Sequence, residues 1–156
     1  MITFTNEIGR FNFRVAGILI ENQKVLVHRL SKDDFYAFPG GRVEMLELTE
    51  NTVVREMKEE LGIDIKVERL LWIGESFFSI EQVKFHELCF YYLINRTGEM
   101  TYDGDSFYVK EGDNSFEFKW IELEKLCDEE VYPVFVRKGI MQLPLTPQKV
   151  NDIKLL

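Results

Sequence analysis

The stretch GGRVEMLELTENTVVREMKEELGI, from Gly40 to Ile63, predicts a helix that follows a glycine-containing loop. We expect the helix to run from Thr49 to Leu61, with Thr49 as its N-cap and Gly62 just beyond its last residue. At about 100° per residue, four apolar side chains share one face, which can pack on a sheet. They are Val53, Val54, Met57 and Leu61.

Three glutamates, Glu56, Glu59 and Glu60, occupy the adjoining face of the same helix. Like charges three and four residues apart repel each other and destabilise a helix, so their position needs an explanation. Arg55 lies four residues before Glu59 and can pair with it. The glutamates form either a solvated acidic face or a site for a hard divalent cation, which prefers oxygen ligands. Mg²⁺ suits such a cluster because it is usually shared between a few carboxylates and substrate phosphates.

The composition is that of an ordinary globular protein. The chain has 156 residues, of which 46% are hydrophobic and 29% charged, and this predicts a single domain over residues 1–156. The formal net charge of −8 argues against a broad surface for long nucleic acid. A small anionic ligand is compatible with this charge if cations or a few local arginines neutralise it.

The remaining bulk features bear on localisation. Cys89 and Cys127 have no metal-type spacing and are expected to be thiols in a reducing compartment. The N-terminus lacks the pattern of a signal peptide, and no apolar segment approaches membrane-spanning length. We therefore expect a cytoplasmic protein without a membrane partner, and a homodimer is left open.

The rest of the chain predicts strands and helices in one mixed α/β domain. The strands form a hairpin from Phe13–Ile20 and Lys24–Leu30, a second pair from Ile65–Ser79 and Val83–Ile94, and a short strand at Ser115–Leu123. A helical turn is expected at Glu122–Cys127 and a last helix from Pro133 to about Leu143. The polar segment Asn95–Ser106 reads as turns.

The spacing of fixed residues around the helix resembles the signature of the MutT/Nudix hydrolase family. Gly41 is followed after five residues by Glu47, and after seven more by the run REMKEELGI, which starts at Arg55. The similarity extends over roughly Phe11–Leu126, through the first hairpin, the FPGG turn and the pair FEFKW and IELEKL. One position departs from many members, which have glycine where this chain has Leu46.

The resemblance implies a Nudix-type α/β/α sandwich with a mixed β-sheet and a loop–helix–loop signature. It implies that Glu56, Glu59 and Glu60 bind Mg²⁺, with Mn²⁺ as a substitute, and that Glu56 or Glu60 also lies near the attacking water. Arg55 would orient the carboxylates by pairing with Glu47 or with Glu59. A further acid from later in the chain often joins such a site, and Glu117 is the first candidate, with Glu111 behind it.

The substrate side of the site is less clearly marked in the sequence. Gly40 and Gly41 are expected to let the backbone turn tightly and approach the substrate, since they lack a Cβ. Arg14 and Arg42 are candidates to neutralise its phosphates. Four aromatic residues either stack on a base or pack in the core. They are Phe35, Tyr36, Phe77 and Phe78.

The implied activity is metal-dependent cleavage of the pyrophosphate linkage in a nucleoside diphosphate derivative or another nucleotide. The extra motifs that mark hydrolases of ADP-ribose, NADH or coenzyme A within the family are missing, so the expected partner is a small nucleotide of unnamed kind. Two alternatives stay open. One is a non-catalytic nucleotide-sensing module, and the other is a pyrophosphohydrolase of RNA 5′ ends, which the acidic charge disfavours.

Overall fold

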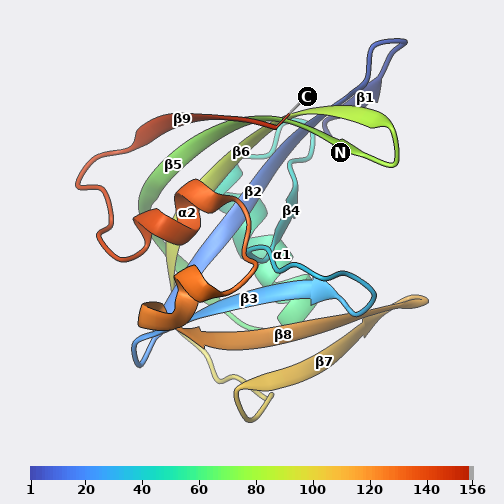
Figure 1. Cartoon of the computed structure of the whole chain (residues 1–156). Coiled ribbons are helices and arrows are strands. Elements are labelled where there is room, and N and C mark those ends of the chain that lie inside the picture. Colours follow the sequence, from blue (N-terminus) through green and yellow to red (C-terminus); the bar gives the residue numbers. More distant parts are fainter. Residues whose placement is uncertain (155–156) are drawn as a thin grey trace.

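The computed structural model describes residues 1–154, which form one nine-stranded sheet, two α-helices and a 3₁₀ helix (Figure 1). The strands are β1 (Thr3–Thr5), β2 (Arg10–Glu21), β3 (Lys24–Leu30), β4 (Gly40–Arg42), β5 (Ile65–Ile80), β6 (Val83–Arg96), β7 (Ser106–Glu111), β8 (Asn114–Glu122) and β9 (Gln148–Ile153). The helices are α1 (Thr49–Leu61), η1 (Leu123–Asp128) and α2 (Val134–Gly139). Among residues 1–154, no helix is both long and apolar enough to cross a membrane.

The sheet is mixed, which confirms the expected fold class. Its strands run in the order β7-β8-β3-β2-β6-β5-β9, with β1 and β4 also paired to β2. The pairs β2–β6 and β5–β9 are parallel, and the other pairs are antiparallel. Strands β2 and β3 are in register only beside their turn, where Ile20 faces Val25 and Glu21 faces Lys24. Beyond this turn the two strands diverge, and β4 takes the place beside β2.

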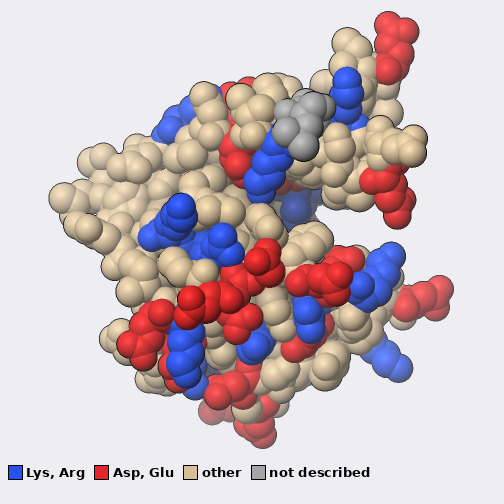
Figure 2. All heavy atoms as spheres, viewed as in Figure 1, with Lys and Arg blue, Asp and Glu red and all other residues tan. Residues whose placement is uncertain are grey.

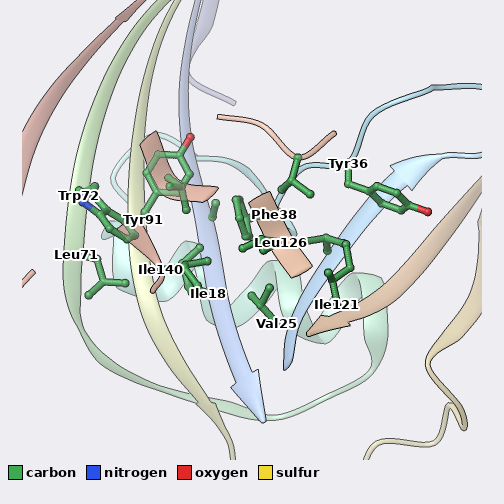
Figure 3. Close-up of a cluster of buried hydrophobic side chains, with 14 of the residues drawn as sticks. Ile18, Val25, Tyr36, Phe38, Leu71, Trp72, Tyr91, Ile121, Leu126 and Ile140 are labelled. Carbon is green, nitrogen blue, oxygen red and sulfur yellow. The ribbon is translucent and has the colours of Figure 1, made fainter. Parts of the chain in front are cut away.

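Helices lie on both faces of the sheet, with α1 behind β2 and α2 in front of it in Figure 1. Because successive residues of a strand point to opposite faces, each strand contributes to two cores. Val15 and Leu19 pack with Met57 and Leu61 of α1. The other core lies on the α2 side and includes ten labelled residues in Figure 3. They are Ile18, Val25, Tyr36, Phe38, Leu71, Trp72, Tyr91, Ile121, Leu126 and Ile140.

Helix α1 has the predicted bounds but differs from the prediction in two details. Its N-cap is Leu48, whose side chain makes no capping hydrogen bond, and Thr49 is the first helical residue. The Thr49 hydroxyl instead lies 2.5 Å from the Tyr92 hydroxyl. Val54 is 39% exposed, so it lies outside the buried apolar face. At the other end Gly62 caps the helix with φ 68°, and its N–H donates to the carbonyl of Lys58, as predicted.

Four strands lie outside the elements expected from the sequence. They are β1, β7 and β9, to which the short strand β4 is added in place of an expected turn; β9 places the C-terminal segment beside β5 in parallel. The last helix spans only Val134–Gly139 and is shorter than expected. The predicted hairpin and the second predicted pair of strands are both confirmed. Their turns lie at Asn22–Gln23 and at Glu81–Gln82, and these four residues have positive φ.

Candidate active site

Arg55, in the middle of the signature helix α1, is the centre of an ion-pair network. Its Nε donates to Glu47 Oε2 at 2.9 Å and its Nη2 to Glu47 Oε1 at 2.9 Å, so the pair is bidentate. Its Nη1 donates to Glu56 at 2.7 Å and to Glu59 at 3.2 Å. Both pairings expected of Arg55 are therefore present. The hydrogen bonds from Arg55 are the main reason why the pKa of Glu47 is lowered to about 2.

Gly41 and Gly40 lie in the extended strand β4, paired with Val15 and Ala16, and not in a tight turn as expected. Each is needed because another group approaches closely. A Cβ on Gly41 would lie 2.2 Å from the Cδ of Glu56, and a Cβ on Gly40 would lie 2.0 Å from the carbonyl oxygen of Val15. Gly41 therefore makes room for the Glu56 carboxylate against the sheet.

Glu60 has a largely buried carboxyl group on the next turn of the helix. Its Oε2 is buried and has no hydrogen-bond partner among residues 1–154. Burial, followed by the nearby charges of Glu56 and Glu111, raises its pKa to about 8. Burial also raises the pKa of Glu56, although Arg55 opposes this shift. A nearby cation would favour the ionised form of both groups.

These residues fit a hard divalent cation in their chemistry. In the side-chain conformation described, residues 1–154 contain no three His, Cys, Asp or Glu groups arranged to hold a metal ion. The Glu59 side chain is 59% exposed and pairs with Arg55 at 3.2 Å. Mg²⁺ commonly takes only one or two protein carboxylates and completes its coordination with water and substrate phosphates. An unpartnered Glu60 oxygen beside Glu56 meets that requirement.

The structure places the two later acids on different sides of the sheet. Glu117 of β8 is only 8% exposed and accepts hydrogen bonds from Arg29 Nε at 2.8 Å and the Tyr36 hydroxyl at 3.1 Å. Its strand neighbours Phe116 and Phe118 pack on the α1 side, so Glu117 points to the opposite face. Glu111 instead lines a cavity of about 60 Å³ together with Glu59 and Glu60. The second candidate, not the first, therefore lies beside the helix carboxylates.

The two candidate arginines are neighbours in register, Arg14 on β2 and Arg42 on β4. The Arg42 carbonyl accepts a hydrogen bond from Arg55, and the Arg42 guanidinium contacts the sulfur of Met1. The Nη1 of Arg14 lies 3.9 Å from Glu87, and its charge favours the ionised forms of Glu56 and Glu60. Arg14 also lines the largest cleft described, so it connects that cleft with the helix carboxylates.

This cleft has a volume of about 570 Å³ and is lined by aromatic and polar side chains from distant segments. Phe35 is 43% exposed on one wall and contacts Tyr132 edge-on, while Phe78 stacks on Phe85. Tyr36, by contrast, is buried in the core. The basic side chains on the face shown in Figure 2 lie in separate groups among acidic ones, which suits a small ligand better than a long polyanion.

Sequence analysis did not identify several residues that line this cleft. Tyr132, Asp152 and Lys154 come from the C-terminal part of the chain, beyond the signature and its similar flanks. Asp152 and Lys154 reach the cleft because β9 pairs with β5, whose partners lie 76 residues apart in sequence, from Trp72 and Gln148 onward. Tyr132 reaches it because the chain beside it pairs with Tyr36. No local pattern in the sequence marks such a long-range pairing. Ser76 and Glu87 lie on predicted strands, but the sequence does not tell which face of the sheet they occupy.

Comparisons with known proteins find matches over most of this chain. The model of the NUDIX domain matches residues 11–140. An ADP-ribose pyrophosphatase of Methanocaldococcus jannaschii is 42% identical over 65 residues, which are 40% of this chain and 38% of that protein. An 8-oxo-dGTP diphosphatase of Buchnera aphidicola is 30% identical over 116 residues, which are 72% of this chain and 78% of that protein. The first of these matches spans well under two thirds of the relative's length.

Solved structures share the fold at low sequence identity. A MutT protein from Bacillus halodurans superposes with a TM-score of 0.63 at 20% identity, covering 84% of this chain and 82% of its own. A UDP-X diphosphatase superposes with a TM-score of 0.62 at 18% identity, covering 90% of this chain and 66% of its own. At these identities the superpositions establish the fold alone.

Proposed function

This chain belongs to the NUDIX family, and we propose that it is a metal-dependent hydrolase of the pyrophosphate linkage in a nucleotide or nucleoside diphosphate derivative. The observation that carries the proposal is the buried, unpartnered carboxyl of Glu60, which lines a small cavity with Glu59 and Glu111 and lies close enough to Glu56 for the two charges to interact. A carboxyl group with a raised pKa that lines a cavity among other acids is typical of a functional site.

We assign the carboxylates of Glu56, Glu59 and Glu60 to a Mg²⁺ or Mn²⁺ ion, with Glu111 in place of Glu117 as the acid from the later strands. When bound, a divalent cation polarises phosphoryl oxygens and lowers the pKa of bound water. Arg55 holds Glu47 and Glu56 in place through its hydrogen bonds. The site then keeps its carboxylates oriented before substrate arrives, which reduces the reorganisation needed during the reaction.

The remaining residues act on the substrate. Arg14 and Arg42 offset the negative charge of the diphosphate, and Glu56 or Glu60 accepts the proton of the attacking water. The cleft behind Arg14 receives the rest of the nucleotide. The names of the relatives suggest the substrates to try first, which are ADP-ribose and 8-oxo-dGTP, followed by a UDP-linked compound.

The test is a panel of nucleoside triphosphates, 8-oxo-dGTP, ADP-ribose and UDP-sugars, incubated with the full chain and Mg²⁺. Release of phosphate, pyrophosphate or nucleoside monophosphate is measured with and without excess chelator. We expect at least one compound to be cleaved, and chelator to abolish its cleavage. Undiminished cleavage in excess chelator would contradict the assignment of a metal ion to the glutamates. If no compound of the panel is cleaved with Mg²⁺ or Mn²⁺, the proposal that the chain is a hydrolase is wrong.

A further inference from the structure

The floor of the large cleft carries a row of hydrogen-bond acceptors on three adjacent strands. Glu87 of β6 faces Ser76 of β5, and Ser76 in turn faces Asp152 of β9. Residues directly opposite each other on paired strands point to the same side of a sheet. All three line the cleft, so they form one row, named here the acceptor row.

The acceptor row has few partners within the protein. Ser76 is 8% exposed, and no side-chain hydrogen bond of its hydroxyl is found among residues 1–154, although the hydroxyl is not among the buried atoms that lack a partner. The nearest cation to Glu87 is Arg14, at 3.9 Å, and the nearest to Asp152 is Lys154, at 3.5 Å. Both separations are too long for a strong charge-assisted hydrogen bond. Because these groups line the cleft and make no short ion pair, the row is suited to donors supplied by a ligand.

The walls above the row are aromatic. Phe35 and Tyr132 meet edge-on with ring centroids 5.8 Å apart, and the Lys154 ammonium lies 4.3 Å from the centre of the Tyr132 ring. Phe35 is 43% exposed, and an exposed aromatic ring can stack on a nucleobase of any kind, because every base has a π-face. An exposed ring above a floor of acceptors matches a planar base or a sugar that carries N–H or O–H groups.

The charges along the cleft also give the ligand a direction. Arg14 lies at the Glu87 end of the acceptor row and toward the carboxylates of α1, where phosphates are expected. Asp152 lies two strands away, at the other end of the row. A nucleotide with its phosphates at Arg14 therefore places its nucleoside over Ser76 and Asp152.

We propose that Asp152 and Ser76 are specificity-determining residues that select a nucleoside by its hydrogen-bond donors. This inference rests on the proposed function, because it takes the occupant of the cleft to be a nucleotide. Strand β9 lies beyond residues 11–140, which match the family model, so Asp152 belongs to the C-terminal segment outside the match, whereas Ser76 lies inside it. The donors are either N–H groups of the base or hydroxyls of the ribose.

The test measures binding of nucleoside monophosphates by calorimetry without added metal, which separates recognition from hydrolysis. GMP is compared with IMP, which lacks the exocyclic amine, and with dGMP, which lacks the 2′-hydroxyl; AMP and dAMP form a parallel pair. We expect wild-type protein to favour the donor-bearing member of at least one pair by about tenfold, as for a hydrogen bond to a charged group. The pair that shows the preference identifies base or ribose as the source.

In Asp152→Asn and in Ser76→Ala, the ratio of the two dissociation constants in that pair should fall toward one. The melting temperature of each variant should stay unchanged. Asp113→Asn, an exposed position in the β7–β8 turn, makes the same charge change outside the cleft and should keep the preference. Equal preferences in Asp152→Asn and wild type, or no binding of any monophosphate at millimolar concentration, overturn the proposal. Monophosphate binding without hydrolysis of any panel compound would instead contradict only the proposed function.

Discussion

Glu56 and Glu60 lie one turn apart on α1, and burial raises the pKa of both carboxyl groups. In Glu60 the shift is from an ordinary value of 4.5 to about 8. The folded protein therefore binds this proton more tightly than the unfolded chain does. Its contribution to stability is complete below pH 4.5 and is lost as the pH rises through about 8.

The first prediction follows from this linkage. In metal-free protein, Glu60→Gln replaces the protonated acid with a neutral group of the same shape. The variant should match the wild type near pH 4.5 and exceed its free energy of unfolding at pH 8.5, by no more than about 5 kcal/mol. Urea unfolding in chelator at both pH values measures the difference. Burial lowers the pKa of His28 to about 4, which makes stability depend on pH in the opposite sense. His28 is present in both proteins, so its contribution cancels when the free energy of unfolding of the wild type is subtracted from that of the variant.

A second prediction concerns catalysis by the same carboxylates. Gln at Glu56, Glu59 or Glu60 keeps the size of the side chain but removes charge, so metal binding and electrostatic stabilisation weaken. We expect kcat/KM to fall by roughly a hundred- to a thousandfold, the effect of about 2.7–4 kcal/mol. Glu50, exposed in the first turn of the helix, is the matched control. Small and equal effects at all four positions would mean that the glutamates form a solvated face.

The adjacent glycines of β4 give a third, paired prediction. In Gly41→Ala the new Cβ meets the end of the flexible Glu56 side chain, which can move away at little cost to stability but leaves its catalytic position. In Gly40→Ala it meets the backbone of β2, which cannot move without disturbing the strand pairing. Gly41→Ala should therefore lose activity with little change in melting temperature, whereas Gly40→Ala should be strongly destabilised. The reverse pattern would contradict the position of Glu56.

At the scale of the elements, helix α1 has two different faces. Leu61 is 2% exposed and Val54 39% exposed, although both belong to the apolar set. Leu61→Ala should lower the free energy of unfolding by roughly 2–5 kcal/mol, as expected for a fully buried leucine. Val54→Ala should cost less than about 0.5 kcal/mol, in the range of ordinary surface changes. Similar losses at the two positions in denaturant unfolding would mean that the helix is rotated about its axis.

Much of this helix could be predicted from sequence, because its period, its glycine cap and its fixed acidic positions are local features. Val54 was placed wrongly because it lies at the edge of the apolar face, where periodicity alone does not decide burial. The face of the sheet on which Glu117 lies was not predictable. Strand alternation places Glu117 on the face opposite Phe116 and Phe118, but it does not say which of the two faces is covered by α1. Strands β7 and β9 were missed because their pairing partners, not their own residues, define them.

At the scale of the whole molecule, the site is assembled from segments that span most of the chain. The signature supplies carboxylates, β2 supplies Arg14, and the C-terminal strand β9 supplies part of the cleft floor. The signature and its flanks could be recognised from sequence, but this part of the cleft floor could not, because it depends on the parallel pairing of β5 with β9. The residues that carry out the proposed reaction were therefore easier to predict from the sequence than the residues that bind the rest of the substrate.

The net charge of −8 leads to the last prediction, which concerns the stability of the complete protein. A cation that binds only the folded state stabilises it by mass action, by about 2.7 kcal/mol at a hundred times its dissociation constant. For a chain of this size that corresponds to a rise in melting temperature of about 5–10 °C. We expect Mg²⁺ to produce this rise in wild-type protein at pH 7.5, measured by calorimetry at constant ionic strength. The rise should shrink in Glu56→Gln and Glu60→Gln and persist in Glu50→Gln. A rise of the same size in all four proteins would place the cation elsewhere on the acidic surface and separate the helix carboxylates from metal binding.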